Sequence, residues 1–96
     1  MNARPRKYRS QIRILADILE AVSRGKGETK PTHILYTANL SHDRLVRYLD
    51  ELKERQLIEE KNNPDGITYA LTDKGIDFLR EFKRITNFTE AFGFPM

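Results

Sequence analysis

Hydrophobic residues recur at helical spacing in the first well-patterned stretch of the chain, from Ser10 to Arg24. One face collects the apolar side chains that return every three or four residues: Ile12, Leu15, Ala16, Leu19 and Val22. Ile18 lies beside this stripe and the charged residues fall elsewhere, so the pattern predicts an amphipathic helix with one buried face. Gly25-Lys26-Gly27 ends it, because glycine adopts the left-handed backbone at little cost.

Two shorter helices are predicted next. The first begins near Pro31, since proline fits the first helical turn, with Thr29 or Lys30 as its cap. Its apolar residues are Ile34, Leu35 and Ala38. Asn39-Leu40 forms a tight connection, and Ser41 is a good N-cap for a third helix that ends near Arg55-Gln56. The third helix has an apolar stripe at helical spacing: Leu45, Tyr48, Leu49 and Leu52.

A β-hairpin and a fourth helix complete the pattern. Residues 57–61 and 67–71 are predicted strands, and the second alternates apolar and polar side chains. Between them Asn62-Asn63-Pro64-Asp65-Gly66 has the composition of a tight turn. Thr72 can cap a helix that starts at Asp73 and continues to about Phe92. The apolar residues of this last helix include Ile76, Leu79, Phe82 and Ile85.

Two short helices joined by a tight turn and followed by a hairpin predict a mainly α fold with a two-stranded β-hairpin, a winged helix-turn-helix. The string Thr32-His33-Ile34-Leu35-Tyr36-Thr37-Ala38-Asn39-Leu40-Ser41, then Arg47-Tyr48-Leu49 and Leu57-Ile58, resembles a family of small archaeal winged-helix proteins. The segment Tyr69-Ala70-Leu71-Thr72-Asp73-Lys74-Gly75 resembles that family's strand-to-helix junction. The resemblance implies a DNA-binding regulator or chromatin-type protein that dimerises through its C-terminal helix as an antiparallel coiled coil. The last helix here is shorter than the long coiled-coil form.

The last helix carries more apolar surface than one small domain can bury. Ile76, Leu79 and part of Phe82 can close the domain's own core. A second stripe follows at nearly 3.5-residue spacing: Phe78, Phe82, Ile85, Phe88 and Phe92. Exposed phenylalanines are an aggregation liability, so this stripe predicts a homodimer interface. The alternative is that the tail folds back over the domain. The chain thus divides into a basic arm (residues 1–9), a winged helix-turn-helix domain (10–72) and a dimerisation helix with its tail (73–96).

The positive charge of the chain is concentrated at its start. The formal net charge of the 96 residues is +3. Residues 1–13 contain five basic side chains and no acidic one, whereas residues 14–96 contain twelve basic and fourteen acidic ones. A basic arm on a nearly neutral domain suits a polyanion such as nucleic acid or an anionic membrane surface. The alternative is a solvated tail. The longest apolar runs are about three residues, so no membrane helix is predicted.

The candidate DNA contacts come from three places. In a helix-turn-helix the N-terminal part of the second helix enters the major groove, which favours Ser41, His42, Arg44 and Arg47. The arm offers Arg4, Arg6, Lys7 and Arg9 to phosphates, and the hairpin tip offers Lys61 and Asn62. The same helix also carries four carboxylates that a duplex would repel: Asp43, Asp50, Glu51 and Glu54. The alternative for this helix is therefore a solvated, internally salt-bridged face.

The function expected from the sequence is double-stranded DNA binding, as a transcriptional regulator or nucleoid-associated protein in the cytoplasm. The alternative is a winged-helix module for protein–protein interaction. An enzyme is not expected: the chain has no Cys, and His33 and His42 lie on different helices without a carboxylate at ligand spacing. No cofactor, metal or small-molecule substrate is predicted. Tyr36 and Tyr48 are expected to be core or boundary residues rather than base-stacking platforms.

Overall fold

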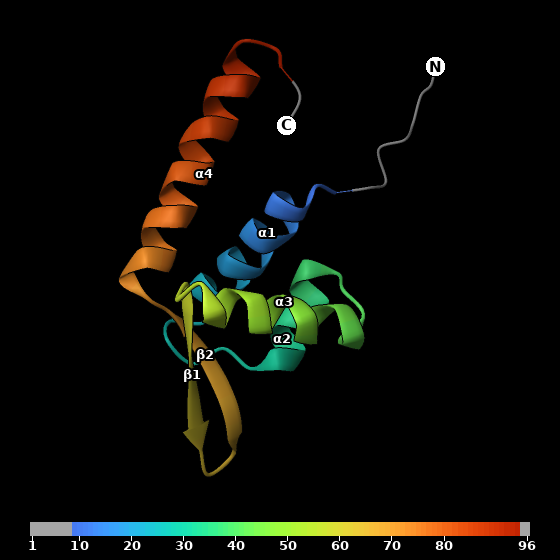
Figure 1. Ribbon diagram of the computed structural model, residues 1–96, viewed down its shortest axis with the longest axis vertical. Coiled ribbons are helices and arrows are strands. Elements are labelled where there is room, and N and C mark those ends of the chain that lie inside the picture. Colours follow the sequence, from blue (N-terminus) through green and yellow to red (C-terminus); the bar gives the residue numbers. More distant parts are fainter. Residues whose placement is uncertain (1–8, 95–96) are drawn as a thin grey trace.

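The computed structural model describes residues 9–94, and its elements follow the predicted order (Figure 1). The described part of the chain contains four helices and one hairpin: α1 (Gln11–Arg24), α2 (Pro31–Ala38), α3 (His42–Glu54), β1 (Ile58–Asn63), β2 (Gly66–Leu71) and α4 (Asp73–Ala91). This arrangement confirms the mainly α fold with a two-stranded antiparallel hairpin, the winged helix-turn-helix. No described helix is both long and apolar enough to cross a bilayer.

Hydroxyl side chains set the starts of three helices. Ser10, Ser41 and Thr72 each accept a hydrogen bond from the backbone N–H three residues later, at 3.1, 3.3 and 3.0 Å. Such a cap is worth about 1 kcal/mol, because it satisfies an N–H that has no partner within its helix. α2 differs: Lys30 precedes Pro31 and makes no side-chain cap within the described residues. Thr29 instead turns inward and donates to the Val22 carbonyl at 2.9 Å.

The turn between α2 and α3 is tight because Asn39 takes the left-handed conformation, with φ of +57°. Asparagine tolerates this region better than most residues do. Leu40, the next residue, is buried in the core and anchors the turn. Ser41 then starts α3 at once, so the direction of the third helix is fixed by three consecutive residues.

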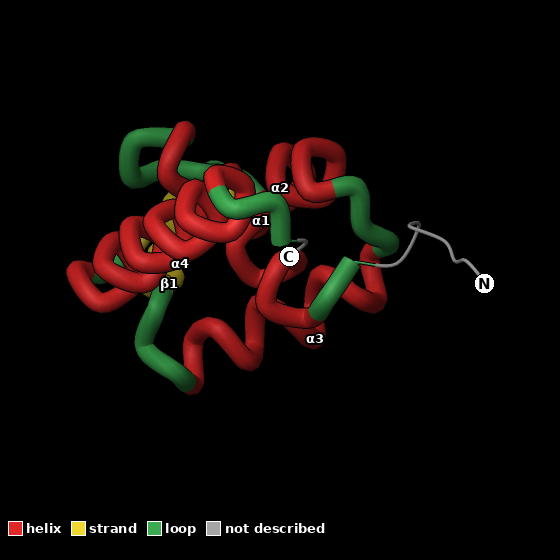
Figure 2. The backbone as a smooth tube through the Cα atoms, turned by 90° about the horizontal axis from the view of Figure 1, so that it is seen from above, coloured by secondary structure: helices red, strands yellow, loops and turns green. Residues whose placement is uncertain are grey.

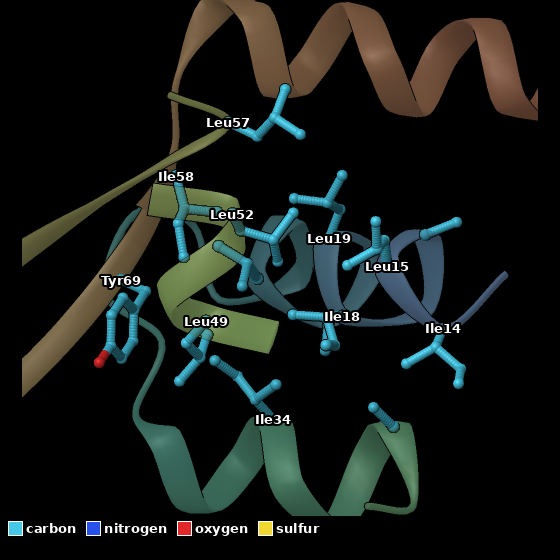
Figure 3. Close-up of a cluster of buried hydrophobic side chains, with 14 of the residues drawn as sticks. Ile14, Leu15, Ile18, Leu19, Ile34, Leu49, Leu52, Leu57, Ile58 and Tyr69 are labelled. Atoms are coloured by element: carbon cyan, nitrogen blue, oxygen red, sulfur yellow. The ribbon is translucent and has the colours of Figure 1, made fainter. Parts of the chain in front are cut away.

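α1 is the centre of the core, with α2 on one side and α4 on the other (Figure 2). Figure 3 shows Ile34 of α2 and Leu52 of α3 facing α1, with Ile58 of β1 and Tyr69 of β2 at the edge of the same cluster. The largest fully buried side chains include Ile18, Leu19, Ile34, Leu45 and Leu52. Because α1 has neighbours on several sides, its buried face is wider than one stripe. Ile14 is buried, whereas Ile12, expected in the core, is 46% exposed. That expectation was wrong.

The hairpin is longer than predicted and its turn is shorter. β1 and β2 pair from Ile58 opposite Leu71 to Asn63 opposite Gly66, so Pro64-Asp65 forms a two-residue loop. Gly66 permits this closure with φ of +126°. Lys61 and Asn62, expected at the tip, are therefore strand residues just before the turn. Thr29 exchanges two backbone hydrogen bonds with Tyr69, of 3.0 and 2.8 Å, which ties the start of α2 to the sheet.

α4 packs on the domain with its first half and projects away from it with its second (Figure 1). Thr72 fixes its start: the hydroxyl donates to the Gln56 carbonyl at 2.6 Å, and the backbone N–H donates to Leu57 at 3.2 Å. Leu79 and Phe82 close the core. Ile76, expected beside them, is 43% exposed and borders an open hollow that Leu79, Arg80 and Lys83 also line. That prediction was also wrong.

Candidate nucleic-acid interface

The first two turns of α3 present four predicted contact residues to solvent. Ser41, His42, Arg44 and Arg47 are all exposed. The Ser41 cap fixes the start of this surface, and Asp43 lies in the first turn, where a carboxylate is favourable to the helix dipole. Arg44 lies over the Tyr48 ring, with its guanidinium carbon 5.9 Å from the ring centroid. Neither Arg44 nor Arg47 forms an ion pair with a carboxylate of residues 9–94.

In the second half of α3, most carboxylates are paired with other side chains of the protein. The Lys53 ammonium lies 2.8 Å from Glu60 of β1 and 3.7 Å from Asp50. The hydrogen bond to Glu60 raises the pKa of Lys53 above its ordinary value. Glu51 accepts from Arg55 at 3.1 Å and from Gln11 of α1 at 3.2 Å. The alternative of an internally salt-bridged face is thus correct for the second half of the helix.

Two carboxylates of α3 stay outside these pairs. Asp43 and Glu54 are exposed and form no ion pair within the described part of the chain. The helix is therefore divided along its length. Its start carries two free arginines and the unpaired Asp43, and its second half carries paired charges together with the unpaired Glu54.

The hairpin offers little positive charge near its turn. Lys61 and Asn62 are exposed on β1, as a wing contact requires. The neighbouring Asn63 is used internally, since its side-chain amide donates to the Thr68 hydroxyl at 2.9 Å. Asp65 places a carboxylate in the loop itself. A contact from the hairpin to a nucleic-acid backbone would therefore depend on Lys61.

Tyr36 of α2 is a surface residue that the sequence interpretation missed. It is 80% exposed, so the expectation of a core or boundary position was wrong, while Tyr48 is half-buried at the boundary as expected. α2 turns Ile34 and Ala38 inward, which leaves Tyr36 on the opposite side of an eight-residue helix. Tyr36 borders an open hollow of about 510 Å³, also lined by Lys30 and His33. Tyr36 follows the buried Ile34 by two residues, which is roughly half a helical turn, so the spacing alone already indicates an exposed position.

Arg9 is placed in an unexpected way, while Arg4, Arg6 and Lys7 lie outside the described residues. Nη1 of Arg9 donates to Asp17 Oδ2 at 2.8 Å and to the Ala38 carbonyl at 2.8 Å. Nη2 of Arg9 donates to the Asn39 carbonyl at 3.1 Å. The guanidinium thus joins the first helix to the end of α2. These partners are 8, 29 and 30 residues away in sequence, so no local pattern could have shown them.

The apolar stripe of α4 divides between the core and the surface. Phe82 is 7% exposed and lies in the core, with the Arg13 guanidinium 5.4 Å from its ring centroid. Phe78 is partly buried against the core. Ile85, Phe88 and Phe92 are 50%, 60% and 66% exposed, and the last two rings lie 4.9 Å apart.

An apolar groove continues this surface towards the domain. Its volume is about 380 Å³, and Ile12, Leu57, Phe78 and Ile85 are among the residues that line it. The alternative, that the tail folds back over the domain, is not what the structure shows for the residues up to 94: Phe94 is 63% exposed, and its backbone N–H donates to the Thr89 carbonyl. We call the surface formed by Ile12, Phe78, Ile85, Phe88 and Phe92 the α4 stripe from here on.

Within residues 9–94, no three side chains of the metal-ligating types come together. His33 lies 3.4 Å from the Thr37 hydroxyl on the same helix. Both histidines lie on the exposed surface of the helix-turn-helix.

A sequence profile of winged helix-turn-helix proteins matches residues 8–90. The chain belongs to the winged helix-turn-helix family. The match covers the helix-turn-helix, the wing and nearly all of α4. No curated protein matches the chain by sequence.

Solved structures with this winged helix-turn-helix fold include several regulators. Sso10a-2, a DNA-binding protein from Sulfolobus solfataricus, superimposes with a TM-score of 0.77 at 23% identity, over 88% of this chain and 85% of that one. PcaV, a transcriptional regulator from Streptomyces coelicolor, and MepR, a transcription regulator of a Staphylococcus aureus efflux pump, each give 0.71 at 18% identity. The matches cover 82% of this chain and 60% of each regulator, so the chain spans about three-fifths of their length. At these identities the similarity is one of fold.

Proposed function

We propose that this protein binds double-stranded DNA, as a transcriptional regulator or nucleoid-associated protein of the cytoplasm, by docking the start of α3 in the major groove. The observation that carries the proposal is that Arg44 and Arg47 are available to a partner. Both side chains are exposed on the first two turns of α3 and have no carboxylate partner within residues 9–94. Arginine binds guanine O6 and N7 or a phosphate, so each can read a base or hold the backbone. Ser41 and His42 flank them as phosphate contacts.

The arm and the wing supply contacts to the DNA backbone in this proposal. Arg4, Arg6 and Lys7 bind phosphates, and Lys61 with Asn62 contacts the backbone from the hairpin. Arg9 is left out of these contacts, because its guanidinium is already bound to Asp17 and two carbonyl groups. Residues 14–96 have two more acidic than basic side chains, so long-range attraction to DNA comes mainly from the arm.

We further propose that two copies pair through the α4 stripe. A C2 dimer places the same surface on both sides of its interface, so an exposed apolar helix half can cover its own copy. Two α3 helices then face two half-sites, as in other helix-turn-helix dimers. An antiparallel pairing of the two α4 helices is the geometry that the resemblance to archaeal winged-helix proteins implies.

The role of α3 is tested by substituting its free arginines. Arg47→Ala and Arg44→Ala should each weaken binding to a selected duplex by about ten- to a hundredfold, since a bidentate arginine–guanine contact contributes roughly 1–3 kcal/mol. Fluorescence anisotropy at fixed salt measures the dissociation constant. Arg80→Ala is the matched control: it removes the same charge from an exposed helix arginine that is paired with Asp77. Parental affinity in both α3 variants would show that this helix does not read DNA.

The role of the arm is tested by replacing Arg4, Arg6 and Lys7 together with Gln, which we call the arm-neutral variant. Each phosphate that a cation neutralises contributes roughly 0.9 to the slope of log affinity against log salt. Two or three contacts per arm should therefore flatten the slope by about 2–3, and by twice that in a dimer using both arms. A slope equal to that of the parent would identify the arm as a solvated tail.

Protein–protein interaction is the second candidate function. It is favoured by Asp43 and Glu54, which share the outward surface of α3 with Arg47 and stay unpaired within residues 9–94. A parent protein that shows no salt-dependent binding to any duplex would support this function over DNA binding.

A further inference from the structure

The large apolar residues along one side of α4 are spaced symmetrically about Ile85. Phe82 and Phe88 each lie three residues from Ile85, and Phe78 and Phe92 each lie seven residues from it. At 3.6 residues per turn, all five positions fall within about 60° of Ile85 around the helix axis. At 1.5 Å per residue, the inner pair lies about 4.5 Å and the outer pair about 10.5 Å from Ile85 along that axis. A two-fold axis through Ile85 would therefore bring every one of these residues to the level of another.

The two halves of α4 differ in shape. Phe78 and Phe82 of the first half line the apolar groove of about 380 Å³, together with Ile12 of α1. The second half projects away from the domain (Figure 1). Its Phe88 and Phe92 are mostly exposed, and their ring centroids lie 4.9 Å apart. One half thus offers a concave apolar surface, and the other offers a projecting pair of aromatic rings.

An antiparallel pair of α4 helices brings these two shapes together. With the two-fold axis at Ile85, Phe92 of a second copy lies beside Phe78, and Phe88 of that copy lies beside Phe82. The same contacts occur twice, as two-fold symmetry requires. A parallel pair would instead place Phe88 and Phe92 against their own copies. It would also bring both domains to the same end of the helix pair, where each domain already covers the first half of its own α4 (Figure 1).

The exposed apolar area matches the needs of a stable dimer. At about 200 Å² for a large apolar side chain, Ile12, Ile85, Phe88 and Phe92 expose roughly 400 Å² per copy. Two copies would cover roughly 800 Å² of apolar surface in this way. Stable interfaces bury about 1,200–2,000 Å² in total, of which about 56–65% is apolar. These four residues therefore supply the apolar area of an interface at the lower end of that range.

The charged residues that border the groove are compatible with a covered groove. Asp77 and Glu81 are paired on their own helix with Arg80 and Arg84, at 2.8 and 3.3 Å. Covering the groove would therefore leave neither carboxylate without a cation. Lys74, which also lines it, has a long side chain that can keep its ammonium in water.

We infer that the two-fold axis of the dimer passes through Ile85, so that Phe88 and Phe92 of each copy enter the apolar groove of the other. This inference rests on the pairing through the α4 stripe proposed above and assigns its register from the residues of this chain. Ile85 meets its own copy at the centre of the interface. The two domains then lie at opposite ends of the helix pair, and the register sets the separation of their α3 helices.

The chain has no cysteine, so single cysteines can map the register through a short bismaleimide cross-linker. Ile85→Cys should be joined to its own copy. Phe78→Cys and Phe92→Cys should each fail to join their own copies, which lie about 21 Å apart along the axis, whereas the two proteins expressed together should give a mixed dimer. Glu90→Cys is the matched control, because this exposed residue of α4 lies about 140° from Ile85 around the axis. The expected products should exceed the control by at least about tenfold, since residues held in contact react at a high effective concentration.

Gel electrophoresis separates the products when one protein of the mixed pair carries a mass tag, and circular dichroism checks that each variant is folded. Ile12→Cys replaces Phe78→Cys if the latter unfolds, because the exposed Ile12 lines the same groove. Joining of Phe92→Cys to its own copy would overturn the register. Absence of the mixed dimer would overturn it equally, provided that the parent sediments as a dimer, and the proposed pairing would stand in both cases. A parent that sediments as a monomer would remove the pairing itself, and this inference with it.

Discussion

Phe88 lies in the middle of the exposed part of the α4 stripe, between Ile85 and Phe92. It is 60% exposed and is not among the residues that form the hydrophobic core. The substitution Phe88→Ala therefore leaves the fold of one protomer intact, because alanine also favours the helix. If two copies pair through the α4 stripe, the same substitution removes apolar contact twice, once from each protomer.

The size of the effect follows from the exposed area. A phenylalanine buries about 200 Å² when fully covered, so 60% exposure leaves roughly 120 Å² for a partner. Truncation to alanine loses about 80–100 Å² of this per protomer, or about 4–5 kcal/mol per dimer at roughly 25 cal/mol per Å². If the partner covers only half of that area, the loss is still about 2 kcal/mol. The dimer dissociation constant should therefore rise by about thirtyfold to several thousandfold.

Sedimentation equilibrium over a range of protein concentrations measures this constant, and circular dichroism checks that each variant is folded. Ile76→Ala is the control, because Ile76 is an exposed apolar residue on another side of α4 and should leave the dimer unchanged. The reasoning fails if the parent sediments as a folded monomer at tens of micromolar. It fails equally if Phe88→Ala and Ile76→Ala shift the constant by the same amount.

Three further predictions concern stability. Gly75→Ala should destabilise the fold by more than about 1 kcal/mol in chemical denaturation, since a Cβ there would overlap the backbone carbonyl of Leu57, which cannot move as a side chain can; a parental midpoint would contradict this. Thr29→Val should cost about 1 kcal/mol, because it deletes the buried hydrogen bond to Val22 while keeping the side-chain shape. The hydrogen bond from Lys83 holds the pKa of Glu20 below its ordinary value of 4.5. The contribution of ionised Glu20 to the free energy of unfolding is therefore complete above pH 4.5 and is lost as the pH falls further. In Glu20→Gln the free energy of unfolding should consequently decrease less steeply below that pH than in the parent.

The order of the elements and the starts of α3 and α4 could be read from the sequence because they depend on neighbours along the chain. Ser41 and Thr72 were predicted as caps, and each makes its hydrogen bond within its own first turn. The turn at Asn39 and the alternation that predicted β2 are equally local. The winged helix-turn-helix arrangement followed from these features together.

Burial could not be read with the same accuracy. Helical spacing shows which residues share a side of a helix, but not which sides are covered. Ile12 lies on the same side of α1 as the buried Leu15 and Leu19, and Ile76 lies one turn from the buried Leu79, yet both are exposed. Ile14 is covered because α1 has several neighbours. Tyr36 stayed exposed because a short α2 turns only one side inward.

The charges of the candidate interface were decided by residues far apart in sequence. Two of the four acids of α3 are paired across or within the fold: Glu51 accepts from Gln11 of α1, and Asp50 lies beside Lys53, which also binds Glu60 of β1. Asp43 and Glu54 stay unpaired within residues 9–94. The guanidinium of Arg9, which was expected to meet phosphates, is bound within the fold by acceptors up to 30 residues away in sequence. The sequence by itself determined local structure, since hydrogen bonds within a turn involve neighbouring residues. Which charges remain free to meet a partner depends on distances across the fold, and only the tertiary structure decides those.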